Sequence, residues 1–145
     1  MFRLLFIFFF LVFFSNAKAD ENYFLSLKYN KVNVRYGPGL DYPIKFVYLK
    51  KNFPVEIIDK KENFRKILDY KNNGGWVHRS QLKKNKSLIT LQEKMLFKNS
   101  TKYSTPIAVI KSGRLLIIEK KGKKWFKVVT GDYSGWVDNE NLWGN

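Results

Sequence analysis

The sequence has no cysteine and a single histidine, His78. The absence of cysteine excludes a disulfide framework, a thiolate metal site, a cysteine nucleophile and a redox dithiol. No HExxH, phosphate-loop or nucleophile-elbow motif is present, and the acids nearest to His78 in sequence, Glu56, Asp59 and Asp69, do not have the spacing of a triad or a metal set. We therefore expect a protein that is not an enzyme, with no catalytic residue, no metal and no cofactor, and with a core held by apolar burial alone.

Long apolar runs are also lacking, with one exception at the start of the chain. Leu4–Phe14 is an unbroken apolar run of eleven residues, preceded by Arg3 and followed by Ser15-Asn16-Ala17-Lys18-Ala19. This layout predicts a secretory signal peptide over residues 1–19, cleaved before Asp20, and a periplasmic or secreted protein. The alternative is retention as a membrane anchor, but a spanning helix needs about 20 apolar residues. Membrane contact is expected only through an uncleaved signal.

Acidic residues are few: 12 Asp and Glu stand against 27 Lys and Arg. Removing residues 1–19 takes away Arg3 and Lys18, which leaves 25 basic residues against 12 acidic ones, a net charge of +13. The excess has two interpretations, a docking surface for an anionic partner or a lysine-rich composition without a partner. The charge is spread along the chain with no run of five basic residues. No nucleic acid is expected as a partner, because of the export signal.

The most informative feature that is present is an internal repeat. Gly75-Trp76-Val77 and Gly135-Trp136-Val137 stand at the same place in two halves, at an offset of 60 residues. Further matches follow in order at 60 to 61 residues: Tyr42 with Tyr103, Leu49 with Ile110, 55–58 with 116–119, 64–67 with 125–128, and Leu82 with Leu142. We infer a duplication, with module 1 over residues 20–83, a degenerate module 2 over 84–145, and a polar linker, Lys83–Ser87, short enough for the modules to touch.

Both halves have the pattern of short strands and turns. Val32–Arg35 alternates apolar and polar residues, as a half-buried strand does, and Gly37-Pro38-Gly39 then predicts a tight, partly left-handed loop. The segments 44–49 and 54–59 are rich in β-forming residues, and 72–75 and 130–132 have hairpin-turn compositions. No apolar period of 3.6 residues extends over ten residues after position 19. The pattern predicts an all-β chain of two small barrels, with five strands in each half.

The sequence resembles the bacterial SH3 family at specific residues. Val32-Asn33-Val34-Arg35-Tyr36-Gly37-Pro38-Gly39, followed by Tyr42-Pro43 and the closing Gly75-Trp76-Val77, is similar to the opening strand, loop and closing strand of that family. The resemblance is strong over 28–83 and weak over 88–143, and it implies two tandem SH3-like barrels in an exported protein. The second copy has Leu96–Lys102 in place of the loop signature, without its glycines. Module 2 is therefore not expected to bind the same ligand.

The resemblance also places the candidate binding residues. In related modules the cleft lies along the first loop and its neighbouring strands, which implies Arg35, Tyr36, Gly37, Pro38, Gly39 and Tyr42 as the ligand-binding set. The alternative is that this loop only turns the barrel and that its aromatics pack structurally. The aromatic residues Phe64, Trp76, Trp125 and Trp136 are predicted to form structural core, since large aromatics tend to be buried.

These features leave three functional hypotheses open. The first is a non-enzymatic exported binding module that recognises peptidoglycan or its stem peptides in the cell envelope. The second is a periplasmic scaffold for protein–protein interactions, whose partner is an envelope protein. The third is a structural protein of the periplasm. The choice among them rests on the resemblance, because small barrels have many unrelated functions.

Overall fold

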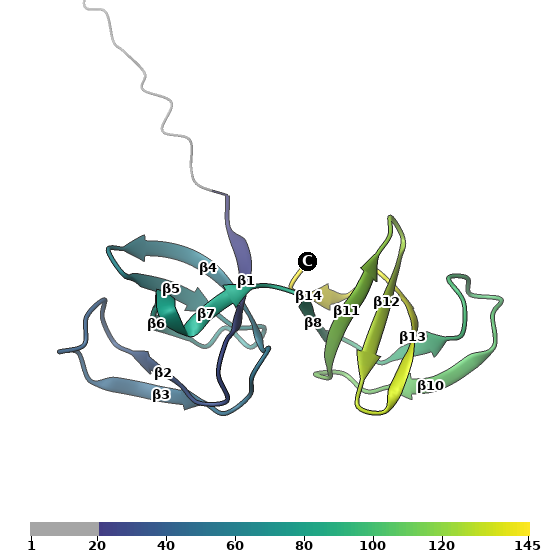
Figure 1. Ribbon diagram of the computed structural model, residues 1–145, viewed down its shortest axis with the longest axis horizontal. Coiled ribbons are helices and arrows are strands. Elements are labelled where there is room, and N and C mark those ends of the chain that lie inside the picture. The colour runs from purple at the N-terminus through teal and green to yellow at the C-terminus, as the bar shows by residue number, and fades with distance from the viewer. Residues whose placement is uncertain (1–20) are drawn as a thin grey trace, which may run out of the picture.

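The computed structural model describes residues 21–145, so the predicted signal peptide and its cleavage site lie outside the described residues. The described chain forms two β modules that lie end to end (Figure 1). The first contains β1 (Tyr23–Leu27), β2 (Val32–Arg35), β3 (Ile44–Tyr48), β4 (Pro54–Lys61), β5 (Phe64–Leu68), β6 (Gly74–His78) and β7 (Leu82–Lys84). The second contains β8 (Ser87–Thr90), β9 (Lys94–Phe97), β10 (Pro106–Ile110), β11 (Leu115–Lys121), β12 (Trp125–Thr130), β13 (Tyr133–Asp138) and β14 (Leu142–Trp143).

The two modules have the same topology, which confirms the duplication. The first antiparallel sheet has the strand order β3-β2-β6-β5-β4-β1-β7, and the second has the order β10-β9-β13-β12-β11-β8-β14. Each half has seven strands rather than the predicted five, because β1 and β7 in the first half and β8 and β14 in the second were not predicted. β7 and β14 are too short to show an alternating pattern. A 3₁₀ turn, η1 (Arg79–Gln81), precedes β7. Among residues 21–145, no helix is long and apolar enough to cross a membrane.

Each sheet curls around its own core, and side-chain alternation decides which residues enter it. In β2, Val32 and Val34 are fully buried, and Asn33 and Arg35 face the opposite side. The first core contains Leu27, Val32, Val34, Val55, Ile57, Ile67, Val77 and Leu82, and the second contains Leu88, Leu96, Ile110, Leu116, Phe126, Val128 and Val137. Burial of one such side chain contributes about 1.5–3 kcal/mol to the stability of the folded state. Each module has its own separate core of this kind.

The prediction that the tryptophans form the core is wrong, whereas Phe64 is buried as predicted. Trp76 and Trp136 precede the core residues Val77 and Val137, and Trp125 precedes Phe126. Because successive strand residues point to opposite faces, each tryptophan lies on the outer face of its sheet and is only partly buried. The two-residue period therefore overrides the general tendency of large aromatics toward the core.

Asp69 organises the turn between β5 and β6. Its Oδ1 accepts hydrogen bonds from the N–H groups of Lys71 and Asn73 at 2.9 Å each, and its Oδ2 accepts from the Tyr48 hydroxyl at 2.9 Å. Burial raises the pKa of the Tyr48 phenol well above its ordinary value, and the charge and hydrogen bond of Asp69 raise it further. Tyr48 thus stays protonated and holds the turn against β3.

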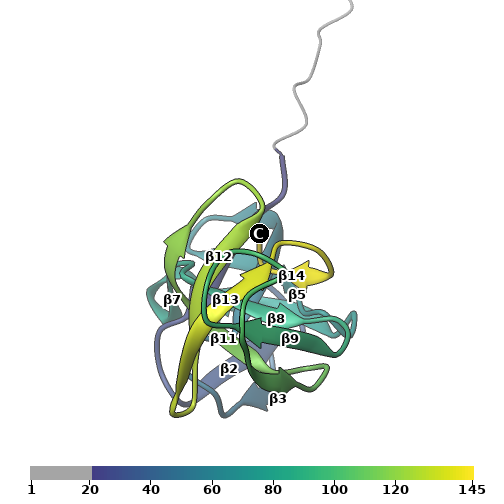
Figure 2. The ribbon, with the colours of Figure 1, turned by 90° about the vertical axis from the view of Figure 1, so that its right-hand side faces the viewer.

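The segment between the sheets is shorter than the predicted linker. Lys83 and Lys84 belong to β7, and Ser87 begins β8, so only Asn85 and Lys86 connect the two sheets. The view along the long axis shows the second module in front of the first (Figure 2). The modules are in contact, as the short linker predicted.

Side chains from both modules meet at this junction. The Trp143 indole lies edge-on to the Phe24 ring, with centroids 5.1 Å apart, and its Nε1–H donates to the Pro54 carbonyl at 3.4 Å. Ser87, buried at the start of β8, donates through its hydroxyl to the Asn52 carbonyl. Apolar packing and hydrogen bonds together hold the two modules in one arrangement.

Candidate binding cleft on the first module

The first module has a cleft of about 540 Å³ beside the loop that follows β2. Its wall combines residues from β2, the β2–β3 loop, β5, β6 and η1 with one residue that precedes β2. The lining residues are Lys31, Asn33, Arg35, Leu40, Phe64, His78, Ser80 and Gln81. Two basic side chains, several hydrogen-bonding groups and two apolar side chains thus converge, which is the composition expected of a small-ligand site.

Asn33 contributes the most unusual atom of the cleft. Its position in β2 places it on the face opposite the core residues Val32 and Val34. The side-chain oxygen Oδ1 is buried, and it has no hydrogen-bond partner among the described residues. A buried acceptor without a partner costs about 1–3 kcal/mol. A ligand N–H that reached this oxygen would recover that cost.

His78 is held at the end of β6 as the cap of η1. Its Nδ1 accepts a hydrogen bond from the Ser80 backbone N–H at 3.2 Å and lies 2.7 Å from the Ser80 hydroxyl. Because the backbone N–H is a donor, Nδ1 is an acceptor, and the proton of the neutral ring lies on Nε2. The Phe64 ring lies edge-on to the imidazole with centroids 5.2 Å apart. His78 therefore offers the cleft a fixed ring with one N–H donor.

Of the six predicted binding residues, Arg35 lines the cleft and the others shape or flank its loop. Tyr36 follows Arg35 on the opposite side and is 62% exposed, with Lys45 Nζ 5.8 Å from its ring centroid. Arg35 donates from Nη1 to the Tyr42 carbonyl at 2.8 Å, which ties the two ends of the loop together. The ligand-binding role of Arg35, Tyr36, Gly37, Pro38, Gly39 and Tyr42 stays a prediction.

The loop needs its glycine for a reason other than the one predicted. Neither Gly37 nor Gly39 has a positive φ, so the expected left-handed backbone is absent from this loop. Instead, the Tyr42 ring covers Gly37, and a Cβ there would lie 2.3 Å from two ring carbons. The close approach of the ring excludes any side chain at position 37, and it holds the loop so that Leu40, 71% exposed, stands at the rim of the cleft.

Sequence reasoning missed Lys31, Asn33, Leu40, His78, Ser80 and Gln81 as cleft residues and placed Phe64 only in the core. Asn33 gave no signal of its own, because Val32–Arg35 alternates apolar and polar residues and an outward-facing polar residue is ordinary in such a strand. The remaining residues come from separate elements, and nothing in the sequence indicates that they meet. Among residues 21–145, no three His, Asp or Glu side chains gather in a way that would hold a metal ion.

Comparison with known families agrees with this architecture. The bacterial SH3 domain matches the chain twice, over residues 28–84 and 94–144. The chain belongs to the bacterial SH3 domain family. The two matches correspond to the two sheets, and they confirm the resemblance inferred from the first loop and the Gly-Trp-Val segments. No curated protein matches the chain.

Solved structures with a similar arrangement include NlpC2 and NlpC1 from Trichomonas vaginalis and an NlpC/P60 family protein from Bacillus cereus ATCC 10987. The sequence identities are 13%, 12% and 12%, and the TM-scores are 0.39, 0.39 and 0.38. The similarity covers 84%, 84% and 82% of this chain, but only 48%, 45% and 55% of those chains. The tandem bacterial SH3 domains described here thus span about half the length of these proteins.

The second bacterial SH3 domain fills the place where the first has its cleft. Arg35 pairs with Trp76 in the first domain, and Phe97 pairs with Trp136 in the second, so Phe97 replaces Arg35 and Met95 replaces Asn33. By the same comparison, Trp125 stands at the position of Phe64 and Asp138 at that of His78. The Phe97 and Trp125 rings are in contact, with centroids 5.8 Å apart. Bulky side chains occupy the equivalent space.

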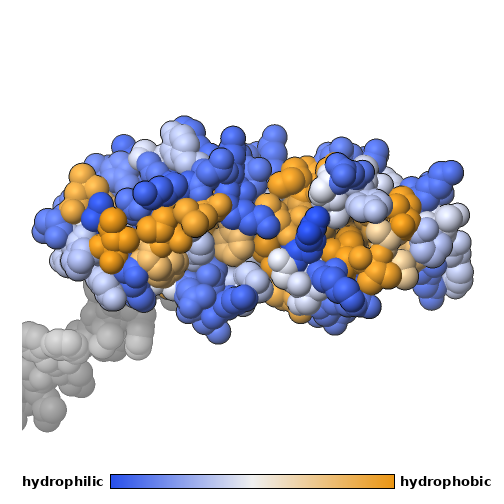
Figure 3. Space-filling model, turned by 90° about the horizontal axis from the view of Figure 1, so that it is seen from below, coloured by the Kyte–Doolittle hydropathy of each residue, from blue (hydrophilic) through white to orange (hydrophobic). Residues whose placement is uncertain are grey.

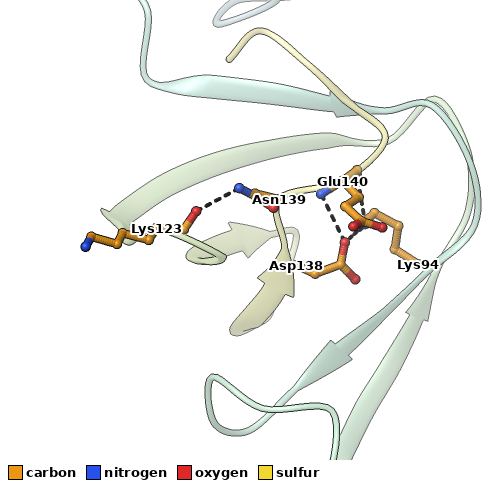
Figure 4. Close-up of polar contacts among 5 residues, drawn as sticks. All are labelled: Lys94, Lys123, Asp138, Asn139 and Glu140. Atoms are coloured by element: carbon orange, nitrogen blue, oxygen red, sulfur yellow. Dashed lines mark hydrogen bonds and ion pairs between the residues drawn. The ribbon is translucent and has the colours of Figure 1, made fainter.

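An ion pair completes this closed arrangement (Figure 4). Lys94 has a side chain that is only 3% exposed, and its Nζ donates to Asp138 Oδ1 and to the Glu140 carbonyl at 2.6 Å each. Asp138 Oδ1 also accepts from the Glu140 N–H at 3.1 Å. The adjacent Asn139 donates from Nδ2 to the Lys123 carbonyl at 2.8 Å. The expectation that the second copy differs from the first in binding has a structural basis in these substitutions.

A second candidate surface lies along the edge strands of both bacterial SH3 domains. β3 and β10 are the terminal strands of their sheets, and they expose Ile44 and Val47, and Ile107 and Val109, respectively. Both strands lie at the lower side of the molecule in Figure 1, and the view from below shows apolar surface on each domain (Figure 3). Exposed apolar edge strands are potential sites for pairing with another chain.

Proposed function

We propose that this chain binds a short peptide of the cell wall, such as a peptidoglycan stem peptide, in the cleft of its first bacterial SH3 domain, and that it does so without catalysing a reaction. The observation that carries this proposal is that Asn33, whose Oδ1 is buried without a partner, lines one cleft together with Arg35 and Lys31. Family membership supports a cell-wall-related binding role of this kind.

The chemistry of the cleft suits a peptide with free carboxylates and small apolar side chains. Asn33 Oδ1 would accept a hydrogen bond from a peptide N–H, and Arg35 and Lys31 would attract a carboxylate. Leu40 and Phe64 provide the apolar part of the cleft wall. Peptidoglycan stem peptides combine these features, and they are cell-wall components that an exported protein would meet.

The arrangement of His78 suits a hydrogen bond to a ligand. Its Nδ1 already accepts from Ser80, so the proton of the neutral ring is carried by Nε2, which can act as a donor. We propose that the protein acts in the periplasm or outside the cell after cleavage before Asp20. Mass spectrometry of the protein recovered from cells tests this part, since a species that still starts at Met1 would contradict it.

Titration with soluble peptidoglycan fragments, followed by NMR, tests the ligand. We expect shifts at Asn33, Arg35 and His78, and a loss of affinity of about tenfold or more in Asn33→Met/Arg35→Phe, which introduces the side chains of the second domain at these positions. Tyr103→Ala, an 85% exposed residue of the second domain, is the control and should leave the affinity unchanged.

A second pair of variants tests the contribution of the positive charges of the cleft. Lys31→Gln and Arg35→Gln each remove one charge from the cleft without filling it, and each should weaken binding by a smaller factor. Shifts that fall on 95–140, or an absence of shifts in the wild-type protein, would overturn the proposal. Shifts along β3 or β10 upon addition of an envelope protein extract would favour the second candidate function, docking of an extended segment of an envelope protein on the apolar edge strands.

A further inference from the structure

Two adjacent hollows lie where the two domains join, on the connecting segment itself. One has a volume of about 610 Å³ and the other of about 450 Å³. Lys84 and Lys86 line both hollows, which therefore share a wall, and the two hollows together are called the groove below. Lys83 and Asn52 belong to the smaller hollow, and Lys121 belongs to the larger one.

The groove is strongly basic. Lys83, Lys84, Lys86 and Lys121 give it four positive charges, and none of the four has an ion-pair partner among the described residues. The connecting segment lies in a stretch without acidic residues, since the chain has none between Asp69 and Glu93. The single acid on the groove wall, Glu119, is paired with Lys127 at 3.6 Å, which offsets part of its negative charge.

Asn85 fixes the backbone between Lys84 and Lys86. Its Oδ1 accepts from the Ser26 hydroxyl and from the Ser87 N–H, and its Nδ2 donates to the carbonyls of Ser87 at 3.0 Å and Gly144 at 2.7 Å. The Lys86 carbonyl in addition accepts from the N–H of Ile118 at 2.8 Å. The backbone on both sides of Asn85 is therefore fixed to both domains, and Lys84 and Lys86 extend as exposed side chains from this fixed backbone.

We propose that this groove binds a linear anion that carries two or more phosphate groups in succession. A lysine ammonium group binds phosphate as a point charge and does not require a planar anion. Four lysines around two adjoining hollows suit a ligand with several phosphate groups better than a ligand with a single phosphate. A fixed site avoids part of the ordering cost of binding. The proposal does not depend on the peptide cleft of the first domain, because no residue of that cleft lines the groove.

The probe for the test is tripolyphosphate, with inorganic phosphate and citrate as comparisons. NMR titration of the protein should produce shifts centred on 83–87 and 117–121, with much weaker effects of inorganic phosphate and of the carboxylates of citrate. Equal effects of citrate would overturn the assignment to phosphate. Vesicles with and without phosphatidylglycerol separate the sources, since binding only to the anionic vesicles would place the phosphates in lipid headgroups.

A charge-matched pair of variants separates a built site from general attraction by a basic protein. Lys84→Gln/Lys86→Gln removes two charges from the groove, and Lys98→Gln/Lys102→Gln removes two from the exposed loop between β9 and β10, at the far end of the second domain (Figure 1). We expect the first pair to weaken tripolyphosphate binding at least tenfold and the second less than twofold. Equal losses, or shifts spread over all lysines, would overturn the proposal. The wild-type shift map decides the matter even where a variant is unstable.

Discussion

The ring of Tyr42 lies against Gly37 so closely that a Cβ at position 37 would be 2.3 Å from its Cδ1 and Cε1 atoms. The Tyr42 side chain thus covers the backbone of the loop after β2, and Arg35 adds a hydrogen bond to the Tyr42 carbonyl at 2.8 Å. Leu40, at the rim of the cleft in the first domain, belongs to the same loop.

Gly37→Ala should therefore displace Tyr42 and destabilise the protein by about 1–3 kcal/mol, the usual cost of overpacking. Urea unfolding measures the loss. Gly39→Ala is the matched control, because its Cβ would meet chiefly the Oδ1 of the Asp41 side chain, which can turn away. The loss should shrink in a Tyr42→Ala background, and a loss of the same size there would show that the ring is not the obstacle.

The buried ion pair of the second domain should respond asymmetrically to substitution. Asp138→Ala leaves the Lys94 ammonium, 3% exposed, with only the Glu140 carbonyl, and we expect a cost of about 3 kcal/mol. Lys94→Met leaves Asp138, which is 45% exposed and can be hydrated, so its cost should be about 1 kcal/mol or less. Urea unfolding of both variants tests this order, and a reversed order would contradict it.

Tyr48 should make the first domain sensitive to alkaline pH. The pKa of its phenol is raised by burial and by Asp69, whereas an unfolded tyrosine titrates near about 10. Above that pH the unfolded state binds fewer protons than the folded state, so stability that is present below about pH 10 falls as the pH rises further. The free energy of unfolding of the wild type and of Tyr48→Phe should therefore be measured at pH 8 and pH 11. The stability of the wild type relative to the variant should be smaller at the higher pH. An advantage independent of pH would refute the assignment.

Asn85→Ala should loosen the junction between the domains. The substitution removes the hydrogen bonds to Ser26, to the Ser87 backbone and to the Gly144 carbonyl, although Trp143 still packs on Phe24. We expect ¹⁵N relaxation to report faster and separate tumbling of the two domains, with each core intact. Asn99→Ala, in the exposed β9–β10 loop, is the control and should tumble as the wild type does. Unchanged tumbling of Asn85→Ala would mean that the tryptophan contact alone fixes the junction.

The architecture of the described chain could be predicted from its sequence. The 60-residue repeat indicated two copies of one fold, and the alternation at Val32–Arg35 and the segments at 44–49 and 54–59 correspond to β2, β3 and β4. These features are readable because a strand has a two-residue period and a turn depends on a few neighbouring residues. The two-residue period also indicates that Trp76 and Trp136 lie on the outer faces of their sheets. The prediction of core positions instead gave more weight to the general tendency of aromatic residues to be buried. The match of Leu49 with Ile110 is off by one residue, since Tyr48 and Ile110 occupy equivalent sheet positions, opposite Val32 and Lys94.

The residues that form the two candidate sites could be identified only after the chain was seen folded. The cleft joins Asn33 from β2 with His78 from β6 and Leu40 from a loop, and the basic groove joins Lys84 with Lys121, so each site depends on contacts between segments far apart in the chain. The sequence did not reveal that Asn33 Oδ1 lacks a partner, because satisfaction of a buried polar atom depends on everything packed around it. Strand periodicity is a local property of the chain, whereas a cleft is a property of how the strands close on one another.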